Sequence, residues 1–387
     1  MPKKANRSSL YTFIGLVLFV ALAGPIAYSF ILSKSDRETP VFETYPAGRL
    51  ENAVKAMDRE IYDALMDLGI PAADVDFAQV RTIESGTEHW TYSELTVHTR
   101  KKIPQARKKA AFVKRLQRLV PRPSVRFVVK SDHRTLMDIS LDGHPTHRVV
   151  FFPHTRKPTP APVPARAKRP KIAIIIDDMG YDLEAALRFL EMDGGLSISV
   201  LPHSPFQTEI ATLAHQSGND VLLHLPMEPL EYPEVDPGPG ALISTMTPDE
   251  LLAQLKFNLD AVPYISGVNN HMGSKLTEDA ARMRQVFTIL KKRNLFFVDS
   301  LTNPKSECSR VAQLFQLPFA ERHVFLDHSQ EANAIRFQIK RLLSIAKKRG
   351  EAVGIAHPYP LTLEILQEQI PHIKHVATIV PVSDLTS

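Results

Sequence analysis

Polar side chains that can bind a metal or move a proton recur at the ends of predicted strands in the second half of this 387-residue chain. Any one of them is weak evidence, because a lone histidine is commonly structural and an aspartate after a strand is commonly a helix cap. Five strand ends of this kind together predict one functional site. The set is Asp177 and Asp178, His224 with Glu228, the run Asn269 to Ser274 that includes His271, Asp299 with Ser300, and His357.

These residue types favour metal-assisted hydrolysis. A ligand set that mixes Asp and His suits a borderline divalent cation such as zinc, whereas an all-carboxylate set would suit calcium or magnesium. Successive side chains diverge along a strand, so one of the adjacent residues Asp177 and Asp178 can bind the metal while the other faces the substrate. The metal would polarise a carbonyl and activate water, and the free carboxylate would act as general base.

Strand and helix patterns alternate from residue 171 onward, as in parallel α/β folds. About 217 residues with eight strands favour a parallel β/α barrel, incomplete or distorted, over an open doubly wound sheet. The carboxyl ends of parallel strands share one mouth, where the polar residues would meet. The expected strands are 172–176, 196–201, 220–225, 265–268, 295–299, 323–326, 352–356 and 376–380, and the expected helices include 183–192, 250–260, 279–293, 332–349 and 361–369.

One of these helices has a well-defined predicted start. Thr247 as N-cap, Pro248 in the first turn and Glu250 three residues after the cap form a capping box.

Residues 171–387 resemble the divergent polysaccharide deacetylase family, a relative of the polysaccharide deacetylases, whose catalytic domain is a distorted β/α barrel. The resemblance rests on five ordered motifs. They are Ile176-Asp-Asp-Met-Gly180, His224-Leu-Pro-Met-Glu-Pro229, Gly267-Val-Asn-Asn-His-Met-Gly-Ser274, Phe297-Val-Asp-Ser300 and Gly354-Ile-Ala-His-Pro358.

The resemblance implies a role for each matching residue. Asp177 would be the catalytic base, Asp178 and His224 would be metal ligands, and His357 would act as the acid. The implied reaction is hydrolysis of an N- or O-acetyl group on an exported glycan such as peptidoglycan. Asp177 accepts a proton from the attacking water, and His357 protonates the leaving amine or alcohol.

The sequence departs from the wider superfamily at two positions. A second ligand histidine is expected four residues after the first, but Glu228 occupies that position. An Arg-Pro-Tyr type motif on the fourth strand is replaced by Asn270-His271-Met272. We therefore predict that His271 supplies the missing ligand, with Glu228 as the alternative.

Four further residues have expected supporting roles. Asn269, Asn270 and Ser274 are candidate donors to substrate, and structural roles in turns are equally open for them. Asp299 is expected to orient a histidine without binding the metal itself. Two other functional classes remain. The chain could be a glycan-binding or scaffold protein that keeps the fold without turnover, or a different metal-dependent hydrolase on the same barrel.

The N-terminal segment predicts a membrane anchor. Residues 1–9 form a basic stub, and residues 10–32 carry no charge and match the thickness of a bilayer core. We predict a single-pass, uncleaved signal anchor in the inner membrane, which places the later domains on the periplasmic side. Ala21-Leu22-Ala23 resembles a processing site, so cleavage is the alternative.

Residues 41–152 are expected to form a small α+β domain of unknown role. An apolar stripe at helical spacing between residues 50 and 68 indicates a helix that docks on a sheet. A second helix at 104–119 and strands at 79–83, 90–98, 125–130, 135–141 and 148–152 complete it. The six prolines of residues 153–170 then predict an extended linker.

Charge is divided unevenly along the chain. Residues 1–170 carry 28 Lys and Arg against 16 Asp and Glu, whereas residues 171–387 carry 19 against 26. The basic run 101–118 indicates a solvated helix face or a surface that docks on anionic polymer or membrane. No nucleic-acid module accompanies the charge, so we predict no nucleic-acid partner. Cys308 is the sole cysteine, which excludes an intramolecular disulfide and favours a structural thiol.

Overall fold

The computed structural model describes residues 49–71, 74–85, 88–99, 103–119, 122–129, 134–152, 169–192 and 194–386. The predicted anchor at 10–32 and most of the predicted linker lie outside these ranges. No helix in the described ranges is both long and apolar enough to cross a bilayer.

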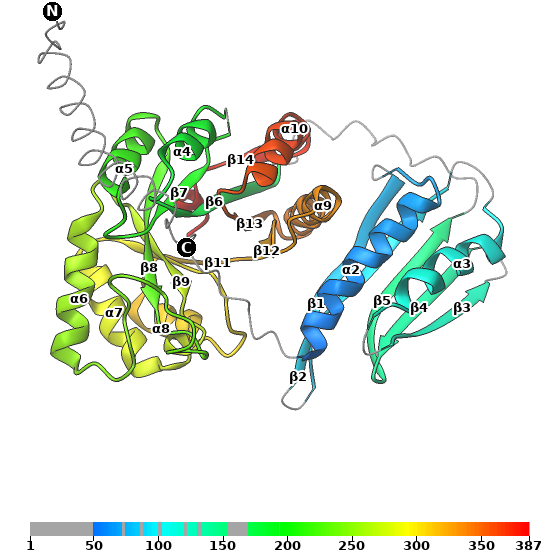
Figure 1. The fold of residues 1–387 in the computed structure, drawn as a ribbon, viewed down its shortest axis with the longest axis horizontal. Helices are drawn as coiled ribbons and strands as arrows, with labels where there is room; N and C mark the ends of the chain where they lie inside the picture. Colours follow the sequence, from blue (N-terminus) through cyan, green and yellow to red (C-terminus); the bar gives the residue numbers. More distant parts are fainter. Residues whose placement is uncertain are drawn as a thin grey trace, which may run out of the picture. The chain divides into compact units, whose positions relative to one another are not determined.

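The first half of the described chain builds a five-stranded sheet with two helices on one face (Figure 1). Its strand order is β1-β2-β5-β4-β3, with every pair antiparallel except β2 and β5. The elements are α2 (Arg49–Asp67), β1 (Val75–Ser85), β2 (Glu88–His98), α3 (Gln105–Leu116), β3 (Ser124–Val129), β4 (Thr135–Leu141) and β5 (His144–Phe152). The predicted elements of this region are therefore confirmed to within a few residues at most ends.

The apolar stripe of α2 forms the core of this part. All six of its predicted apolar residues are buried, namely Leu50, Val54, Met57, Ile61, Leu65 and Leu68. Basic helix α3 is not uniformly solvated. The ammonium of Lys108 lies 4.7 Å from the ring centroid of Phe151, and Arg115 pairs with the α2 carboxylates of Asp63 and Asp67.

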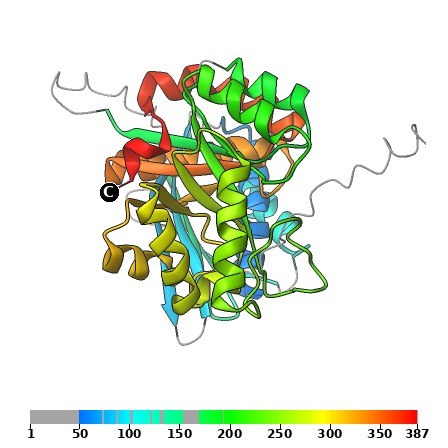
Figure 2. The ribbon, with the colours of Figure 1, turned by 90° about the vertical axis from the view of Figure 1, so that its left-hand side faces the viewer.

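The second half builds a nine-stranded parallel sheet surrounded by helices (Figures 1 and 2). The strands are β6 (Lys171–Met179), β7 (Ser197–Val200), β8 (Asp220–Met227), β9 (Gly267–Met272), β10 (Phe296–Asp299), β11 (Phe319–Glu321), β12 (Val324–Phe325), β13 (Glu351–Ala356) and β14 (Thr378–Ile379). The helices are α4 (Leu183–Leu190), α5 (Gln207–Gln216), α6 (Pro248–Ala261), η2 (Leu276–Glu278), α7 (Ala280–Lys292), α8 (Cys308–Phe315), α9 (Ala332–Arg349), α10 (Pro360–Val376) and η3 (Val382–Leu385).

The large sheet is a curled half-barrel. Its hydrogen-bonded order is β11-β10-β9-β8-β7-β6-β13-β12, with β14 added beside β6. The end strands β11 and β12 are separated in sequence by only Arg322 and His323, so the sheet must curl until its two ends approach each other. The Arg322 amide donates to the Asp299 carbonyl on β10, and the His323 amide donates to Val353 on β13. The predicted parallel barrel is thus present in incomplete form.

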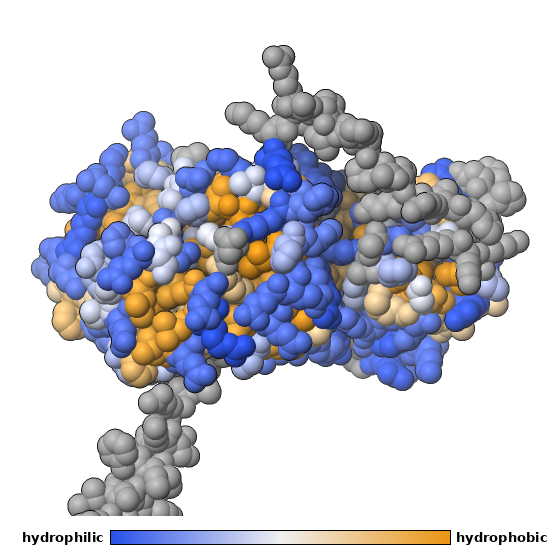
Figure 3. All heavy atoms as spheres, turned by 90° about the horizontal axis from the view of Figure 1, so that it is seen from above, coloured by the Kyte–Doolittle hydropathy of each residue, from blue (hydrophilic) through white to orange (hydrophobic). Residues whose placement is uncertain are grey.

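Alternate residues of these strands are buried on opposite faces of the sheet. On β6, Ile172, Ile174 and Ile176 pack outward against the helices, whereas Ala173 and Ile175 face the interior. Burial on both faces explains why this strand is a continuous apolar run. The helices bury one side each, and the face seen in Figure 3 is accordingly hydrophilic over much of its area, with apolar patches between.

Local signals in this half are largely confirmed. The capping box at the start of α6 is present, with Thr247 and Glu250 bonded reciprocally. Helix α10 runs seven residues beyond its predicted end, to Val376, and the sequence patterns do not predict β11. Cys308 is buried at the start of α8, and burial raises the pKa of its thiol, as expected for a structural cysteine.

Candidate metal centre

A backbone irregularity at the end of β6 turns both adjacent carboxylates toward the interior. Strict alternation would send Asp177 inward and Asp178 outward with Ile176. The pairing register with β7 shifts between Ile176 and Met179, and Asp178 adopts a left-handed φ of +56°. Such a bulge re-aims the side chain that follows it. As a result, His224 Nε2 lies 3.0 Å from an Asp178 oxygen and 3.8 Å from an Asp177 oxygen.

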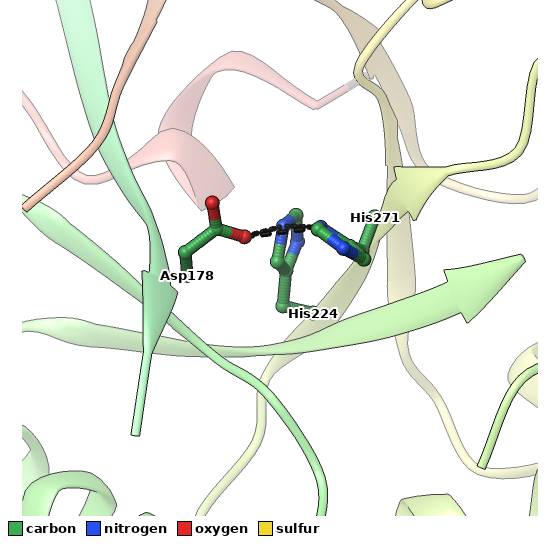
Figure 4. Close-up of side chains that lie close together, drawn as sticks. All are labelled: Asp178, His224 and His271. Carbon is green, nitrogen blue, oxygen red and sulfur yellow. Dashed lines mark hydrogen bonds and ion pairs between the residues drawn. The ribbon is translucent and has the colours of Figure 1, made fainter. Parts of the chain in front are cut away.

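Asp178, His224 and His271 converge on one point (Figure 4). Asp178 Oδ1 lies 3.0 Å from His224 Nε2 and 3.0 Å from His271 Nδ1, and the two histidine nitrogens are 3.1 Å apart. All three residues are buried. They come from β6, β8 and β9, and in-register pairing of Pro226 with His271 places the two histidines on the same side of neighbouring strands. This arrangement can hold a metal ion.

The chemistry of these atoms fits a cation. Both carboxylate oxygens of Asp178 are buried and lack a well-aligned hydrogen-bond donor. Burial would lower the pKa of His224, but the facing carboxylates of Asp177 and Asp178 raise it, so the surroundings favour positive charge at Nε2. A proton on His224 Nε2 can be shared by only one pair of these atoms. A divalent cation can bind Asp178 Oδ1, His224 Nε2 and His271 Nδ1 at the same time. Ligands of this type bind zinc at about 2.0–2.2 Å.

Asp178, His224 and His271 are called the metal triangle below. Asn269 on β9 contacts both this triangle and Asp177. Its Nδ2 donates to Asp177 Oδ1 at 2.8 Å, and its Oδ1 accepts from His224 Nδ1 at 3.0 Å. Ser199 on β7 donates to the same oxygen. The side chain is fully buried and its amide bonds Asp177, His224 and Ser199, and the predicted contact of Asn269 with substrate stays a prediction.

His357 lies next to Asp178. Its Nε2 lies 3.9 Å from Asp178 Oδ2, and its Nδ1 lies 2.9 Å from Asp327 Oδ1. Asp327 also accepts from the His357 amide and the Thr362 hydroxyl, which fixes its orientation. The His357 side chain is 16% exposed, more than that of Asp177, His224 or Asp178, so it is the most accessible of these four side chains.

The surroundings raise the pKa of both Asp177 and His357. Burial raises the pKa of Asp177, partly offset by the nearby charges of His224 and His357. Burial would lower the pKa of His357, but Asp327 and then Asp178 and Asp177 raise it to about 9. The surroundings therefore favour the protonated form of His357 at neutral pH and increase the proton affinity of Asp177.

A family model described as divergent polysaccharide deacetylase matches residues 174–386, more than half of the chain. The chain belongs to the divergent polysaccharide deacetylase family. Its α/β fold with a curled parallel sheet carries the Asp-His-His centre at the carboxyl ends of the strands.

Similar proteins extend over the same half of the chain. The chain is 39% identical over 215 residues to the uncharacterized protein YibQ of Escherichia coli K12, covering 56% of this chain and 67% of that protein. It is 34% identical over 197 residues to an uncharacterized protein of Haemophilus influenzae, covering 51% and 70%. The crystal structure of the uncharacterized protein ATU2773 from Agrobacterium tumefaciens C58 shares the fold, with a TM-score of 0.55, 21% identity and coverage of 57% and 91%.

Glu228 is not a member of the metal triangle in this deacetylase-family chain. Its carboxylate accepts from Lys275 Nζ at 2.7 Å and from the Ser244 amide at 2.5 Å. Burial would raise the pKa of Glu228, but these two donors lower it. Glu228 therefore ties the loop after β8 to the loop after β9, and the geometry favours His271 over Glu228 as the third ligand.

Three other predicted residues support the backbone around the centre. Asn270 donates to the Met272 carbonyl and accepts from the Ser300 amide, and Ser274 accepts from the Leu230 amide. Both side chains are buried, and these bonds agree with the structural alternative, while contact with substrate stays a prediction. The Asp299 carboxylate accepts from Ser306 and from the Leu301 amide of its own loop, and its expected role of orienting a histidine stays a prediction.

Asp327 is the residue that sequence reasoning missed. It follows a predicted strand and precedes His328, so it resembles an ordinary helix entry. Its partner His357 is 30 positions away, directly after the neighbouring strand β13. The sequence carries one signal for this contact. Two strands that are neighbours in the sheet are each followed by a titratable residue.

Proposed function

We propose that this protein is a metal-dependent hydrolase that removes acetyl groups from an extracytoplasmic polysaccharide, with peptidoglycan or another acetylated glycan as substrate. Membership of the deacetylase family supports the reaction class and the kind of substrate. The observation that carries the proposal is the Asp178–His224–His271 triangle, with Asp177 3.8 Å from His224 and His357 3.9 Å from Asp178.

Asp178, His224 and His271 would hold a divalent cation, and zinc suits this mixed set of ligands. When bound, the cation polarises the acetyl carbonyl and lowers the pKa of water. Asp177 accepts a proton from the water that adds to the carbonyl carbon. His357, held through Nδ1 by Asp327, donates its proton to the leaving atom as the C–N or C–O bond breaks. The products are acetate and a free amine or alcohol.

The decisive experiment compares acetate release by the parent protein and Asp177→Asn on acetylated peptidoglycan fragments and chitin oligosaccharides. The amide cannot accept the proton, so we expect turnover to fall by about 10²–10⁴-fold. Asp182→Asn is a matched control, because Asp182 caps α4 outside the site and asparagine is an equally good cap. Equal release by Asp177→Asn and the parent would remove Asp177 as the base.

A second function remains the alternative. A chain that binds zinc through the triangle and binds these glycans, yet releases no acetate from any of them, would be a glycan-binding protein that keeps the deacetylase fold.

We further propose that residues 10–32 anchor the protein in the inner membrane with the catalytic part on the periplasmic side. The uncharged run and the preceding basic residues support this placement. Recovery of the full chain in the soluble fraction after cell lysis would contradict it.

A further inference from the structure

One side chain contacts both the proposed base and a proposed metal ligand. Asn269 lies in register with His224 across the β8–β9 pair, so the two side chains stand next to each other on the inner face of the sheet. From there its amide reaches Asp177 on β6 and His224 on β8 with its two ends. Asp177 and His224 are 47 residues apart in sequence, and Asn269 bridges them directly.

The chemistry of the partners fixes which end of the amide faces which group. An ionised carboxylate only accepts hydrogen bonds, so the end that faces Asp177 at 2.8 Å is the NH₂ group. The carbonyl end then faces His224 and requires its proton to be on Nδ1. This leaves Nε2, the atom that faces Asp178 and His271, free to bind a cation.

Two further contacts hold the amide in this orientation. The Ser199 hydroxyl donates to Asn269 Oδ1, and the Asn269 NH₂ group also lies 3.3 Å from Ser300 Oγ. The side chain is fully buried, so a rotated amide would leave several polar groups without partners. An unpaired polar group in a buried position destabilises the folded state, so the observed orientation is favoured.

We propose that Asn269 is a positioning residue with two separate tasks. Its carbonyl sets the tautomer of His224 for metal binding, and its NH₂ group holds Asp177 in place for proton transfer. The inference rests on the proposed function, since it assumes that the triangle binds a cation. Substitutions at position 269 can separate the two tasks. Aspartate keeps the acceptor but removes the NH₂ donor, whereas leucine removes both.

The test measures Zn²⁺ affinity of the full-length protein by competition with a chromogenic chelator. We expect Asn269→Leu to lose about 10–100-fold in affinity, as is usual when the partner of a ligating histidine is removed. Asn269→Asp should bind Zn²⁺ at least as tightly as the parent, because its carboxylate still accepts from His224 Nδ1. Its kcat for acetate release should nevertheless fall about 10–100-fold with KM unchanged, since Asp177 loses its donor.

Asn258→Leu is the matched control. Asn258 is a buried amide on α6 that donates to the Gly240 carbonyl and accepts from Gln254, away from the triangle. This variant loses the same polar group and should keep the Zn²⁺ affinity of the parent. If Asn269→Leu does not fold, Asn269→Ala replaces it with the same expected loss.

Three outcomes would overturn the inference. Parent-like affinity in Asn269→Leu would show that the tautomer of His224 does not depend on Asn269. An equal loss in Asn269→Asp and Asn269→Leu would show that the two ends have no separate tasks. A parent protein that binds no Zn²⁺ would overturn the proposed function and this inference with it, and the parent measurement alone distinguishes that case.

Discussion

Asp178 is the residue whose backbone conformation forms the candidate metal centre. Its left-handed φ of +56° places its carboxylate on the same side of the strand as that of Asp177. Aspartate tolerates this region better than most residues, and such conformations persist where the surrounding structure determines them. Met272 and Leu301, which follow the site residues of β9 and β10, have φ values of +53° and +48°. Left-handed residues thus mark three of the strand ends that form the site.

The buried carboxyl group of Asp299 is expected to make the stability of the folded state depend on pH. Burial raises its pKa to about 6, although Ser306 and Leu301 donate to it and partly offset that effect. The ordinary pKa of this carboxyl group is 3.8, so as pH rises the unfolded chain releases the proton before the folded chain does. The folded state therefore loses stability as pH rises from about 4 to about 6. We expect Asp299→Asn to be more stable than the parent by about 1–3 kcal/mol at pH 7.5.

Below the ordinary pKa the carboxyl group is protonated in both states, so this advantage should disappear near pH 4. Urea unfolding of both proteins at pH 4 and pH 7.5 measures the difference. An advantage of the same size at both pH values would mean that the ionised carboxylate is not its cause.

At the scale of elements, Gly180 sets the turn from β6 into the following segment. Its φ is +137°, and a Cβ atom built there would lie 2.0 Å from Ser204 Oγ and 2.7 Å from Ser204 Cβ. Gly180→Ala should therefore displace the segment after β7 from the end of β6. Gly218→Ala is the control, because Gly218 also has a positive φ, +75°, but an added Cβ meets nothing within 4 Å.

Strain costs about 1–2 kcal/mol at the φ of Gly218, which lies near the left-handed helical region, whereas at Gly180 both the less accessible φ and the clash with Ser204 add to that cost. Thermal unfolding should show a clearly lower midpoint for Gly180→Ala than for Gly218→Ala. Equal midpoints would mean that Ser204 moves aside without cost.

Sequence patterns predict most elements of this fold, because strands buried on both faces and amphipathic helices leave a clear periodicity. They predict which strand ends carry the site, yet they do not separate the roles of residues at those ends. Asn269 and His271 belong to one motif, but only the curvature of the sheet decides that the first bridges Asp177 and the second faces Asp178. The role of Asp327 is not predicted in this way, because its contact with His357 depends on which strands are neighbours in the sheet and not on residue spacing in the sequence.

At the scale of the whole second half of the chain, the curl of the sheet brings His357 to the Asp178–His224–His271 triangle. The triangle is built on β6, β8 and β9, whereas His357 follows β13 and Asp327 follows β12 at the end of the sheet. The interior below them is filled by apolar residues, including Val380, Val382 and Leu385 of the C-terminal segment. The Val382 amide donates to Ser197 at the start of β7, so this segment packs at the end of the barrel opposite the site.

Because the ligands lie on three strands of one sheet, metal binding should stabilise the folded state of this half. Free Zn²⁺ at 100 times its dissociation constant adds about 2.7 kcal/mol, which is about 5–10 °C in unfolding temperature for a domain of this size. We expect this shift in thermal scans of the full-length protein and its reversal by EDTA. Asp178→Ala should lose it, whereas His203→Gln, which changes a histidine after β7 that bonds Asn258 outside the triangle, should keep it. An equal shift in Asp178→Ala and the parent would mean that zinc acts through other groups among the 15 histidines of the chain.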